Sequence, residues 1–187
     1  MNYTFANKAE LLAQARRDDA CSPGLLWCED MSLRAILKNM PMDWRLWCLE
    51  RGYVQFAEHC DWHTVRASGW AYLLMKQPQY ADKCDWAMMN RCKATAWVWL
   101  IGRQPQFIKH CNRQKLRGVE WVAILCAQPQ LAEECYWHRL NGCDWSRLLA
   151  HKPQFADKCD FSKLTARDWA YLVDEQPQFA SYRTATT

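Results

Sequence analysis

Apolar residues recur along the chain in short groups separated by polar turns, and residues 145–164 show one copy of the pattern. Trp145, Leu148 and Leu149 stand at positions i, i+3 and i+4, which lie on one face of a helix. Pro153 follows, and a proline disfavours the helical conformation of the residue before it while suiting the first turn of a new helix. The pattern therefore predicts a helix of about two turns that ends before the proline, where a second short helix begins.

The second short helix and the connector after it also carry apolar side chains. Phe155 and Cys159 are four residues apart and share a helix face, and Phe161 and Leu164 lie in the connector at residues 160–166. We expect all four side chains to face the core. Helices this short are not stable in isolation, so the stability of each unit must come from stacking on its neighbours.

This unit is repeated along most of the chain. A glutamine followed by an aromatic residue or by leucine recurs with steps of 24, 27, 24, 24 and 24 residues. In most copies a tryptophan stands nine residues before this glutamine and a cysteine five residues after it. The glutamines are Gln55, Gln79, Gln106, Gln130, Gln154 and Gln178; the tryptophans are Trp70, Trp97, Trp121, Trp145 and Trp169; the cysteines are Cys60, Cys84, Cys111, Cys135 and Cys159. A fixed period of this length is typical of a solenoid.

The sequence therefore predicts an all-α protein, a superhelical solenoid of short helices built from repeats of about 24 residues. Residues 1–43 are predicted to form an N-terminal helical cap, because an amphipathic pattern at residues 5–17 precedes the repeats and end units are usually atypical. Residues 44–180 hold the tandem repeats. Residues 181–187 are polar and are predicted to be a disordered tail.

The unit reads W-x-x-L-[LI]-x-x-Q-P-Q-F-A-x-x-C-D-W-x-x-L and resembles an uncharacterised bacterial and phage repeat family with the running text QPQFADKCDW. That resemblance brings no activity with it. More loosely, residues 44–180 resemble leucine-rich-variant repeats, which implies a superhelix in which each α-helix stacks against a 3₁₀ turn. Tryptophan and cysteine at the core positions depart from that second family. The alternative fold is an α/β solenoid like that of leucine-rich repeats, although the connectors lack its L-x-L strand pattern.

Composition adds a prediction about the cysteines and the compartment. The chain has 187 residues, with 12 tryptophans and 11 cysteines. Equivalent atoms of stacked helices lie ~8–10 Å apart, which exceeds the ~7 Å between Cα atoms that a disulfide allows. The repeat cysteines are therefore expected to be buried thiols, as suits a reducing cytoplasm. No signal peptide is expected, because residues 1–20 mix charges without an apolar run, and no membrane-spanning window is present.

Metal binding has some support in cysteine and histidine spacing. Cys60 with His63, and Cys135 with His138, stand three residues apart. The two pairs are three repeats apart, however, and zinc sites normally gather four ligands. The sequence contains no C-x-x-C pair. We therefore expect neither a metal nor a cofactor.

Catalysis by a thiol is a second possibility that the sequence raises. Cys92, Cys126 and Cys143 lie outside the repeat pattern, and Cys143 has His138 and His151 near it in sequence. A catalytic cysteine needs such a basic partner in space. The simpler interpretation is a connector thiol beside a helix-capping carboxylate. The glycines are scattered singly, so no phosphate-binding loop is present. We expect a protein that is not an enzyme.

Two rows of polar residues follow from the repeat. The first is the row of glutamines after the prolines, which are expected to satisfy backbone groups at the short helix ends, or alternatively to form an amide row for a ligand. The second is a set of basic residues in the connectors, which stacking is expected to align along one ridge. These residues are Arg66, Arg91, Lys93, Arg113, Lys115, Arg117, Arg139, Lys163 and Arg167.

The ridge is the basis of the functional prediction. Variable side chains on a stacked scaffold are typical of a solenoid's binding surface, although an ordinary solvated edge would look the same. We expect a non-catalytic scaffold that binds a protein partner, as an inhibitor or adaptor of bacterial or phage origin, for example one directed against a host defence protein. The alternative is nucleic-acid binding along the ridge, which the net charge of +4 permits without requiring. No small-molecule substrate is indicated.

Overall fold

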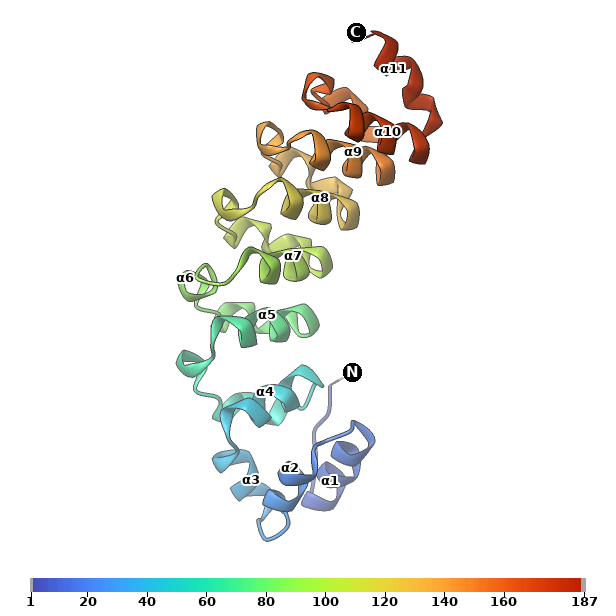
Figure 1. Ribbon diagram of the computed structural model, residues 1–187. Helices are drawn as coiled ribbons and strands as arrows, with labels where there is room; N and C mark the ends of the chain where they lie inside the picture. Colours follow the sequence, from blue (N-terminus) through green and yellow to red (C-terminus); the bar gives the residue numbers. More distant parts are fainter. Residues whose placement is uncertain (1, 186–187) are drawn as a thin grey trace. The chain divides into compact units, whose positions relative to one another are not determined.

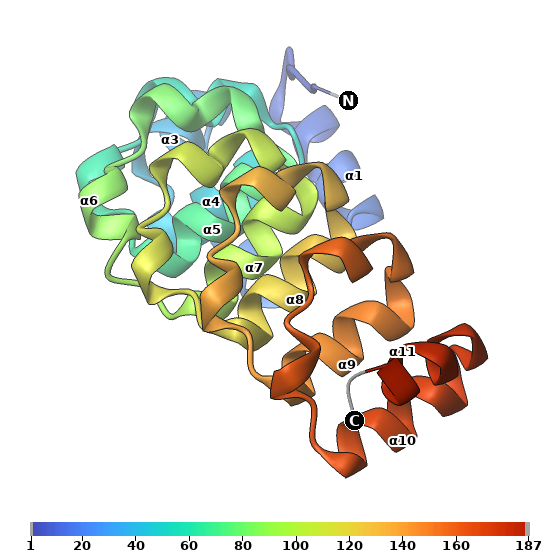
Figure 2. The ribbon, with the colours of Figure 1, turned by 90° about the horizontal axis from the view of Figure 1, so that it is seen from above.

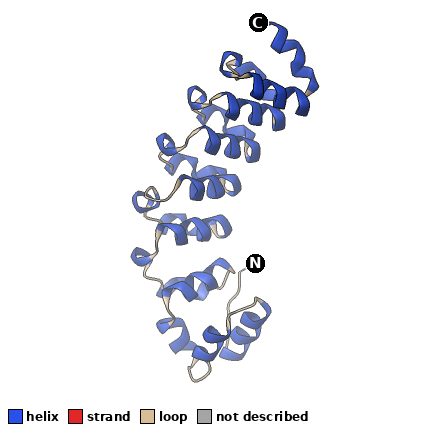
Figure 3. Ribbon diagram, viewed as in Figure 1, coloured by secondary structure: helices blue, strands red, loops and turns tan. Residues whose placement is uncertain are grey.

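The computed structural model describes residues 2–185 and divides the chain into two compact units, Met1–Cys92 and Lys93–Thr187 (Figure 1). Each unit is described by itself. Both consist of short helices joined by tight turns. Figure 3 shows helices and loops only, and residues 2–185 contain no strand apart from an isolated bridge between Tyr3 and Tyr53. The all-α prediction is confirmed, and the α/β alternative is wrong.

The first unit begins with four helices that lack the regular spacing of the later ones. Its helices are α1 (Lys8–Arg17), α2 (Ser22–Cys28), α3 (Leu33–Asn39), α4 (Met42–Glu50), α5 (Ala67–Lys76) and α6 (Trp86–Met89), with 3₁₀ helices η1 (Val54–His59), η2 (Trp62–Thr64) and η3 (Pro78–Lys83). Helix α4 packs on α5, and the N-terminal segment returns to the end of α4 through the backbone of Tyr3 and Phe5. Residues 1–43 therefore belong to the same compact unit as the first repeats.

The second unit has a regular alternation of one α-helix and two 3₁₀ helices. Its α-helices are α7 (Ala94–Arg103), α8 (Gly118–Ala127), α9 (Gly142–His151), α10 (Ala166–Glu175) and α11 (Ala180–Ala185), and its 3₁₀ helices are η4 (Pro105–His110), η5 (Arg113–Lys115), η6 (Pro129–Glu134), η7 (Trp137–Arg139), η8 (Pro153–Lys158), η9 (Phe161–Lys163) and η10 (Pro177–Phe179). Helices α7 to α10 pack in consecutive pairs, and Figure 2 shows them one beside the next from above.

The proline of each unit produces the 3₁₀ helix rather than a second α-helix. The residue before the proline is not helical, so the α-helix ends just ahead of it. In α8, which ends at Ala127, this residue is Gln128, with φ −136° and ψ 72°. Pro129 then opens η6, which ends at Glu134 before the extended Cys135. A further three-residue 3₁₀ helix lies in the connector, where the sequence predicted no regular structure. The position of the second helix agrees with the sequence pattern, and its 3₁₀ type agrees with what the loose resemblance to leucine-rich-variant repeats implies.

The repeat tryptophans fill the core, as the sequence predicted. Trp70, Trp97, Trp121, Trp145 and Trp169 are all at most 7% exposed. A connector aromatic eight residues earlier stacks on the indole ring: Trp137 lies 5.3 Å from Trp145 with an interplanar angle of 8°, and Phe161 lies 5.6 Å from Trp169 at 13°. The buried indole N–H groups of Trp121 and Trp145 have no hydrogen-bond partner within the described part of the chain. These rings therefore stabilise the unit through packing alone.

The cysteines are thiols throughout, and residues 2–185 contain no disulfide. Burial raises the pKa of Cys60 to about 11 and the pKa of Cys111, Cys135 and Cys159 to about 12. These side chains are therefore protonated and uncharged at neutral pH. Cys111 and Cys135 are buried as the sequence led us to expect, whereas Cys60, Cys84 and Cys159 are only half-buried.

Capping boxes begin the last two repeat helices, where the spacing of Asn141 with Asp144 and of Thr165 with Asp168 predicts them. The Asp144 amide donates to the Asn141 side chain at 2.9 Å, and the Asn141 amide donates to the Asp144 carboxylate at 3.2 Å. The same carboxylate lies against the first residue of the preceding helix, Gly118, where an added Cβ would be 2.0 Å from Oδ2. A Cβ added to Gly142 would likewise lie 2.2 Å from the carbonyl oxygen of Lys163. Glycine at these helix starts allows successive units to approach closely.

The glutamine prediction was wrong about which glutamine satisfies the backbone. The glutamine before the proline does so: Gln128 Nε2 donates to Gly102 O at 2.7 Å, and Gln176 Nε2 donates to Ala150 O at 2.7 Å. The glutamine after the proline donates instead to its neighbour's side chain; Gln79, Gln106, Gln130 and Gln178 all do so at 2.6–3.0 Å. A glutamine is long enough to reach the preceding helix only from the residue that ends its own helix.

The tail prediction was also wrong where the structure describes it. Residues 180–185 form α11, and the Tyr182 ring lies 5.2 Å from Phe161 and 5.3 Å from Phe179. An aromatic side chain in a polar segment was the available signal. Residues 186–187 lie outside the described residues.

Replacing Gly142 by alanine tests the close approach of successive units. Alanine normally stabilises a helix interior by about 1 kcal/mol relative to glycine, but here its Cβ would meet the backbone of Lys163. We expect Gly142→Ala to lower the free energy of unfolding by ~1–3 kcal/mol in urea denaturation. Gly102→Ala is the control, because its Cβ would meet only Ala127 Cβ at 3.7 Å, and it should raise stability by about 0.5–1 kcal/mol. Equal effects at the two positions would contradict this account.

Removing the amide before the proline tests the contact between helices. Gln176→Ala should cost about 1 kcal/mol of unfolding free energy, because the Ala150 carbonyl at the end of α9 loses its side-chain donor. Gln178→Ala should stay within ~0.5 kcal/mol, since that side chain is exposed. The two variants are compared by chemical denaturation, and a larger loss for Gln178→Ala would restore the original assignment.

Candidate partner-binding surface

Two of the nine predicted connector cations form ion pairs with glutamates of the second compact unit, residues 93–187. Arg113 pairs with Glu134. Arg117 pairs with Glu120 at 2.8 Å, and its backbone amide also donates to the Glu120 carboxylate at 2.9 Å. The hydrogen bond from Arg117 holds the pKa of the buried Glu120 below its usual value. Arg117 therefore caps the start of α8, and Arg113 holds the side of η6.

Two further cations hold one connector to the one before it. Arg139 Nη1 donates to the carbonyl oxygen of Leu116 at 3.2 Å and also to that of Gln114. Lys163 stands 24 residues later and donates through Nζ to His138 O at 3.2 Å and Leu140 O at 3.1 Å. Because the same position performs the same task in two consecutive units, these charges are part of the stacking of the repeat.

The remaining five cations are exposed. They are Arg66 and Arg91 in the first unit, and Lys93, Lys115 and Arg167 in the second. At least four of the nine side chains are thus engaged in contacts within the chain. A role of the nine in binding a partner stays a prediction.

Sequence reasoning missed a second exposed surface, on the α-helices themselves. The residue two positions after each repeat tryptophan is about 200° around the helix from it and so faces away from the core. In the second unit this position holds Trp99, Ala123, Arg147 and Tyr171, on α7 to α10 in order. Trp99 is 56% exposed and Tyr171 38% exposed, although both are large apolar residues. The signal was the variability of this position between units.

A groove of about 410 Å³ runs across this surface from α8 to α10. We call it the α8–α10 groove. Its lining includes Val119, Val122, Ala123, Arg147, His151 and Tyr171. The Asp144 carboxylate also reaches it but is occupied by the capping box. The groove therefore combines an apolar floor with an exposed guanidinium and an exposed imidazole.

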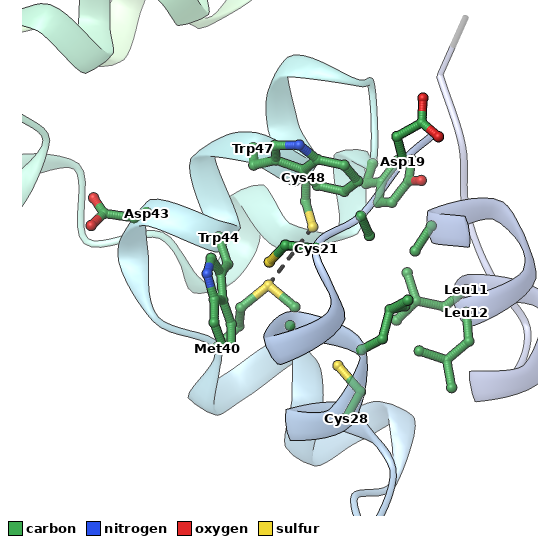
Figure 4. Close-up of a pocket in the computed structure, with 15 residues that line it drawn as sticks. Leu11, Leu12, Asp19, Cys21, Cys28, Met40, Asp43, Trp44, Trp47 and Cys48 are labelled. Carbon is green, nitrogen blue, oxygen red and sulfur yellow. Dashed lines mark hydrogen bonds between the residues drawn. The ribbon is translucent and has the colours of Figure 1, made fainter. Parts of the chain in front are cut away.

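The first unit contains a smaller cavity of about 230 Å³ between α1, α2 and α4, which we call the α1–α4 pocket (Figure 4). Leu11 and Leu12 face it from α1, and Trp44 and Trp47 face it from α4. Its sulfur groups are Cys21, Cys28, Met40 and Cys48. The repeat pattern could not predict this pocket, since its walls come from the irregular N-terminal end of the chain.

The residues considered for metal and thiol chemistry do not gather into a site. Residues 2–185 contain no group of three or more histidine, cysteine or acidic side chains placed to hold a metal ion. Burial raises the pKa of Cys126, which disfavours the thiolate that a nucleophile needs. Cys143 is exposed near the start of α9, and its carbonyl oxygen accepts from the Ser146 hydroxyl at 3.1 Å.

Together these features define a class of structure, an all-helical array of short α/3₁₀ units, without a recognised family. No family model matches the chain, and no curated protein or solved structure is significantly similar to it. The resemblance to the QPQFADKCDW repeats therefore stays a prediction. None of the described helices has the length and apolar content needed to cross a membrane.

Truncating Arg139 tests whether the connector cations stabilise the repeat. Arg139→Ala should lower the free energy of unfolding by about 1–2 kcal/mol, because two carbonyl groups of the preceding connector lose a charged donor. Arg167→Ala is the matched control, exposed on α10, and should change stability by less than ~0.5 kcal/mol. Thermal and urea unfolding of the two variants would show the difference, and equal stabilities would return Arg139 to the set of binding candidates.

Proposed function

We propose that the chain is a solenoid of short helices that binds a protein partner and has no catalytic role of its own, so that it acts as an inhibitor or an adaptor. The observation that carries this proposal is the α8–α10 groove with the exposed aromatic residues of the same helix face. Tryptophan, tyrosine and arginine are the residues most often responsible for binding energy at protein interfaces. Trp99 on α7, Arg147 on α9 and Tyr171 on α10 supply all three.

The solenoid proposal is supported by the recurrence of the same contacts from unit to unit. The glutamine before the proline reaches the end of the preceding helix, and the connector cation reaches the preceding connector. Repeats that contact only their neighbours in this way build extended surfaces, which suit macromolecules better than small substrates. The 11 thiols without a disulfide in the described residues favour a reducing compartment, and we propose the cytoplasm.

Nucleic-acid binding receives less support. It needs several cations free to contact phosphates, whereas Arg113, Arg117, Arg139 and Lys163 are engaged within the chain. The net charge of +4 is also small. The helix face offers aromatic and aliphatic groups beside one arginine, which is closer to the composition of a protein interface.

Affinity capture from lysate with groove variants tests the proposal. The wild-type chain, the double variant Arg147→Glu with Tyr171→Ser, and the control Lys158→Glu are each used as bait, and the captured proteins are identified by mass spectrometry. Hot-spot substitutions typically cost ~2 kcal/mol or more, so the groove variant should lose a protein that both other baits retain after nuclease treatment. Lys158 lies on η8 and is exposed, outside the groove.

Two results would contradict the proposal. One is recovery of the same proteins by all three baits, which would show that the groove is not the interface. The other is capture that disappears with nuclease, which would favour nucleic acid. Circular dichroism of each bait establishes that the variants are folded before they are compared.

A further inference from the structure

The α1–α4 pocket is larger than the voids that folded proteins normally keep. Interiors are packed to the density of organic crystals, with few voids larger than a water molecule. Here about 230 Å³ remains open between Leu12 and Ala15 of α1 and the indole rings of Trp44 and Trp47 of α4. Figure 4 shows Leu12, Trp44 and Trp47 around a common space, with the Met40 sulfur between them and joined to the Cys48 thiol by the dashed line. A space of this size needs an explanation in terms of what occupies it.

The walls of the pocket are mostly apolar. The Tyr53 hydroxyl already donates to the Asp18 carboxylate at 2.6 Å, and the Cys48 thiol lies 3.7 Å from the Met40 sulfur. Burial raises the pKa of Cys28 and of Cys48, so both thiols are uncharged at neutral pH. Asp19 and Asp43 are exposed, and Figure 4 shows the Asp43 carboxylate directed away from the pocket.

Water and charged ligands are therefore poor occupants. A buried water molecule usually makes about three hydrogen bonds, and apolar cavities without such partners stay dry. A carboxylate in the pocket would lose its hydration without gaining a counter-charge. An ammonium group would find carboxylates only at the exposed Asp19 and Asp43, on the solvent side of the pocket. Size limits the choice further, because a dry apolar cavity of about 150 Å³ already accommodates benzene. The pocket has room for one or two fused rings.

We propose that the α1–α4 pocket is a binding site for an uncharged, apolar small molecule, most favourably an aromatic one. Indole rings contact other aromatic rings in stacked or edge-on arrangements, and sulfur atoms make favourable contacts with ring edges. Trp44, Trp47, Met40 and Cys48 supply both kinds of wall. The site lies within residues 1–92 and is independent of the α8–α10 groove, which lies within residues 93–187.

The rim of the pocket is fixed and open. Asp19 has the left-handed conformation at φ 59°, which reverses the chain between α1 and α2. The Ala20 amide donates to Ala15 O at 2.9 Å, and Arg51 Nε donates to Asp18 O at 3.3 Å, so the turn is held from both sides. Cys21 on this rim is exposed. A ligand can enter past the turn without unfolding α1.

Titration of the full chain with 1-aminonaphthalene, a fluorescent probe of two fused rings that is uncharged at neutral pH, tests for the site. We expect saturable binding of one probe per chain, displaced by indole and by toluene but not by benzoate at the same concentration. Absence of saturable binding would overturn the proposal. Displacement by benzoate as effective as that by toluene would also overturn it, because the walls as described discriminate against charge.

The methionine methyl groups locate the bound molecule without any dependence on a variant's stability. In ¹³C-methyl-methionine spectra, indole should shift the Met40 signal, because Met40 lines the pocket, and should leave the Met89 signal unchanged. Met89 is the matched control, since it is fully buried in α6. Assignment uses Met40→Leu and Met89→Leu. Shifts of Met89 alone, or of neither signal, would place the molecule elsewhere and overturn the assignment.

Filling the pocket gives the complementary test. Ala15→Leu and Ala20→Leu each add side-chain volume at the pocket wall, and we expect each to weaken probe binding by about tenfold or more. Ala13→Leu makes the same change on the exposed face of α1, outside the pocket lining, and should leave binding unchanged. Equal affinity in folded filling variants and in the wild type would overturn the proposal. So would binding of tryptophan only within a peptide and never of indole alone, which would assign the pocket to a partner's side chain.

Discussion

The packing of one buried indole ring in each repeat is the contact on which the fold depends. Each repeat helix is only about ten residues long, as α9 is from Gly142 to His151, and a helix of that length is marginal in water without tertiary contacts. Trp145 supplies those contacts by presenting its ring to Trp137 at 5.3 Å, in nearly parallel planes, with Phe155 tilted against Trp137 at 5.5 Å. Three aromatic residues from three segments thus form one core layer. Trp137 and Phe155 come from the 3₁₀ helices η7 and η8, on either side of α9 in the chain.

The polar contacts between units are secondary to this packing and set the register. A glutamine at the end of one helix donates to the end of the preceding helix, and a cation in one connector donates to the carbonyls of the preceding connector. These two contacts lie at opposite ends of the repeat, so they fix both the distance and the rotation between neighbouring units. Their regular use explains why several side chains that resembled a binding ridge in the sequence are engaged in stacking. The helix face that carries Trp99 and Tyr171 stays exposed.

The sequence was sufficient to predict features that depend on the spacing of residues along the repeat. It could not predict features that depend on the direction in which a side chain points. The buried tryptophans, the capping boxes at Asn141 and Thr165 and the alternation of two helical segments followed from spacing alone. Spacing could not tell which of two glutamines, Gln176 or Gln178, points to the preceding helix, because both recur with the same period. The α8–α10 groove and the α1–α4 pocket were missed for a related reason. The groove depends on where several neighbouring helices carry small side chains, which no single repeat shows. The pocket lies in the N-terminal segment, before the repeat pattern begins.

The glycines at the helix starts bear on how such an array can grow or end. Gly118 and Gly142 each precede a unit whose capping aspartate or connector carbonyl lies within 2.2 Å of where a Cβ would be. Ala166 occupies the same position in α10, the last long helix, and Ala94 occupies it before the unit that is capped by Glu120 instead of aspartate. The first residue of each repeat helix therefore suits the repeat that follows it. Duplicating or exchanging a repeat would require a matching change between glycine and alanine at this position, which constrains the order of the repeats.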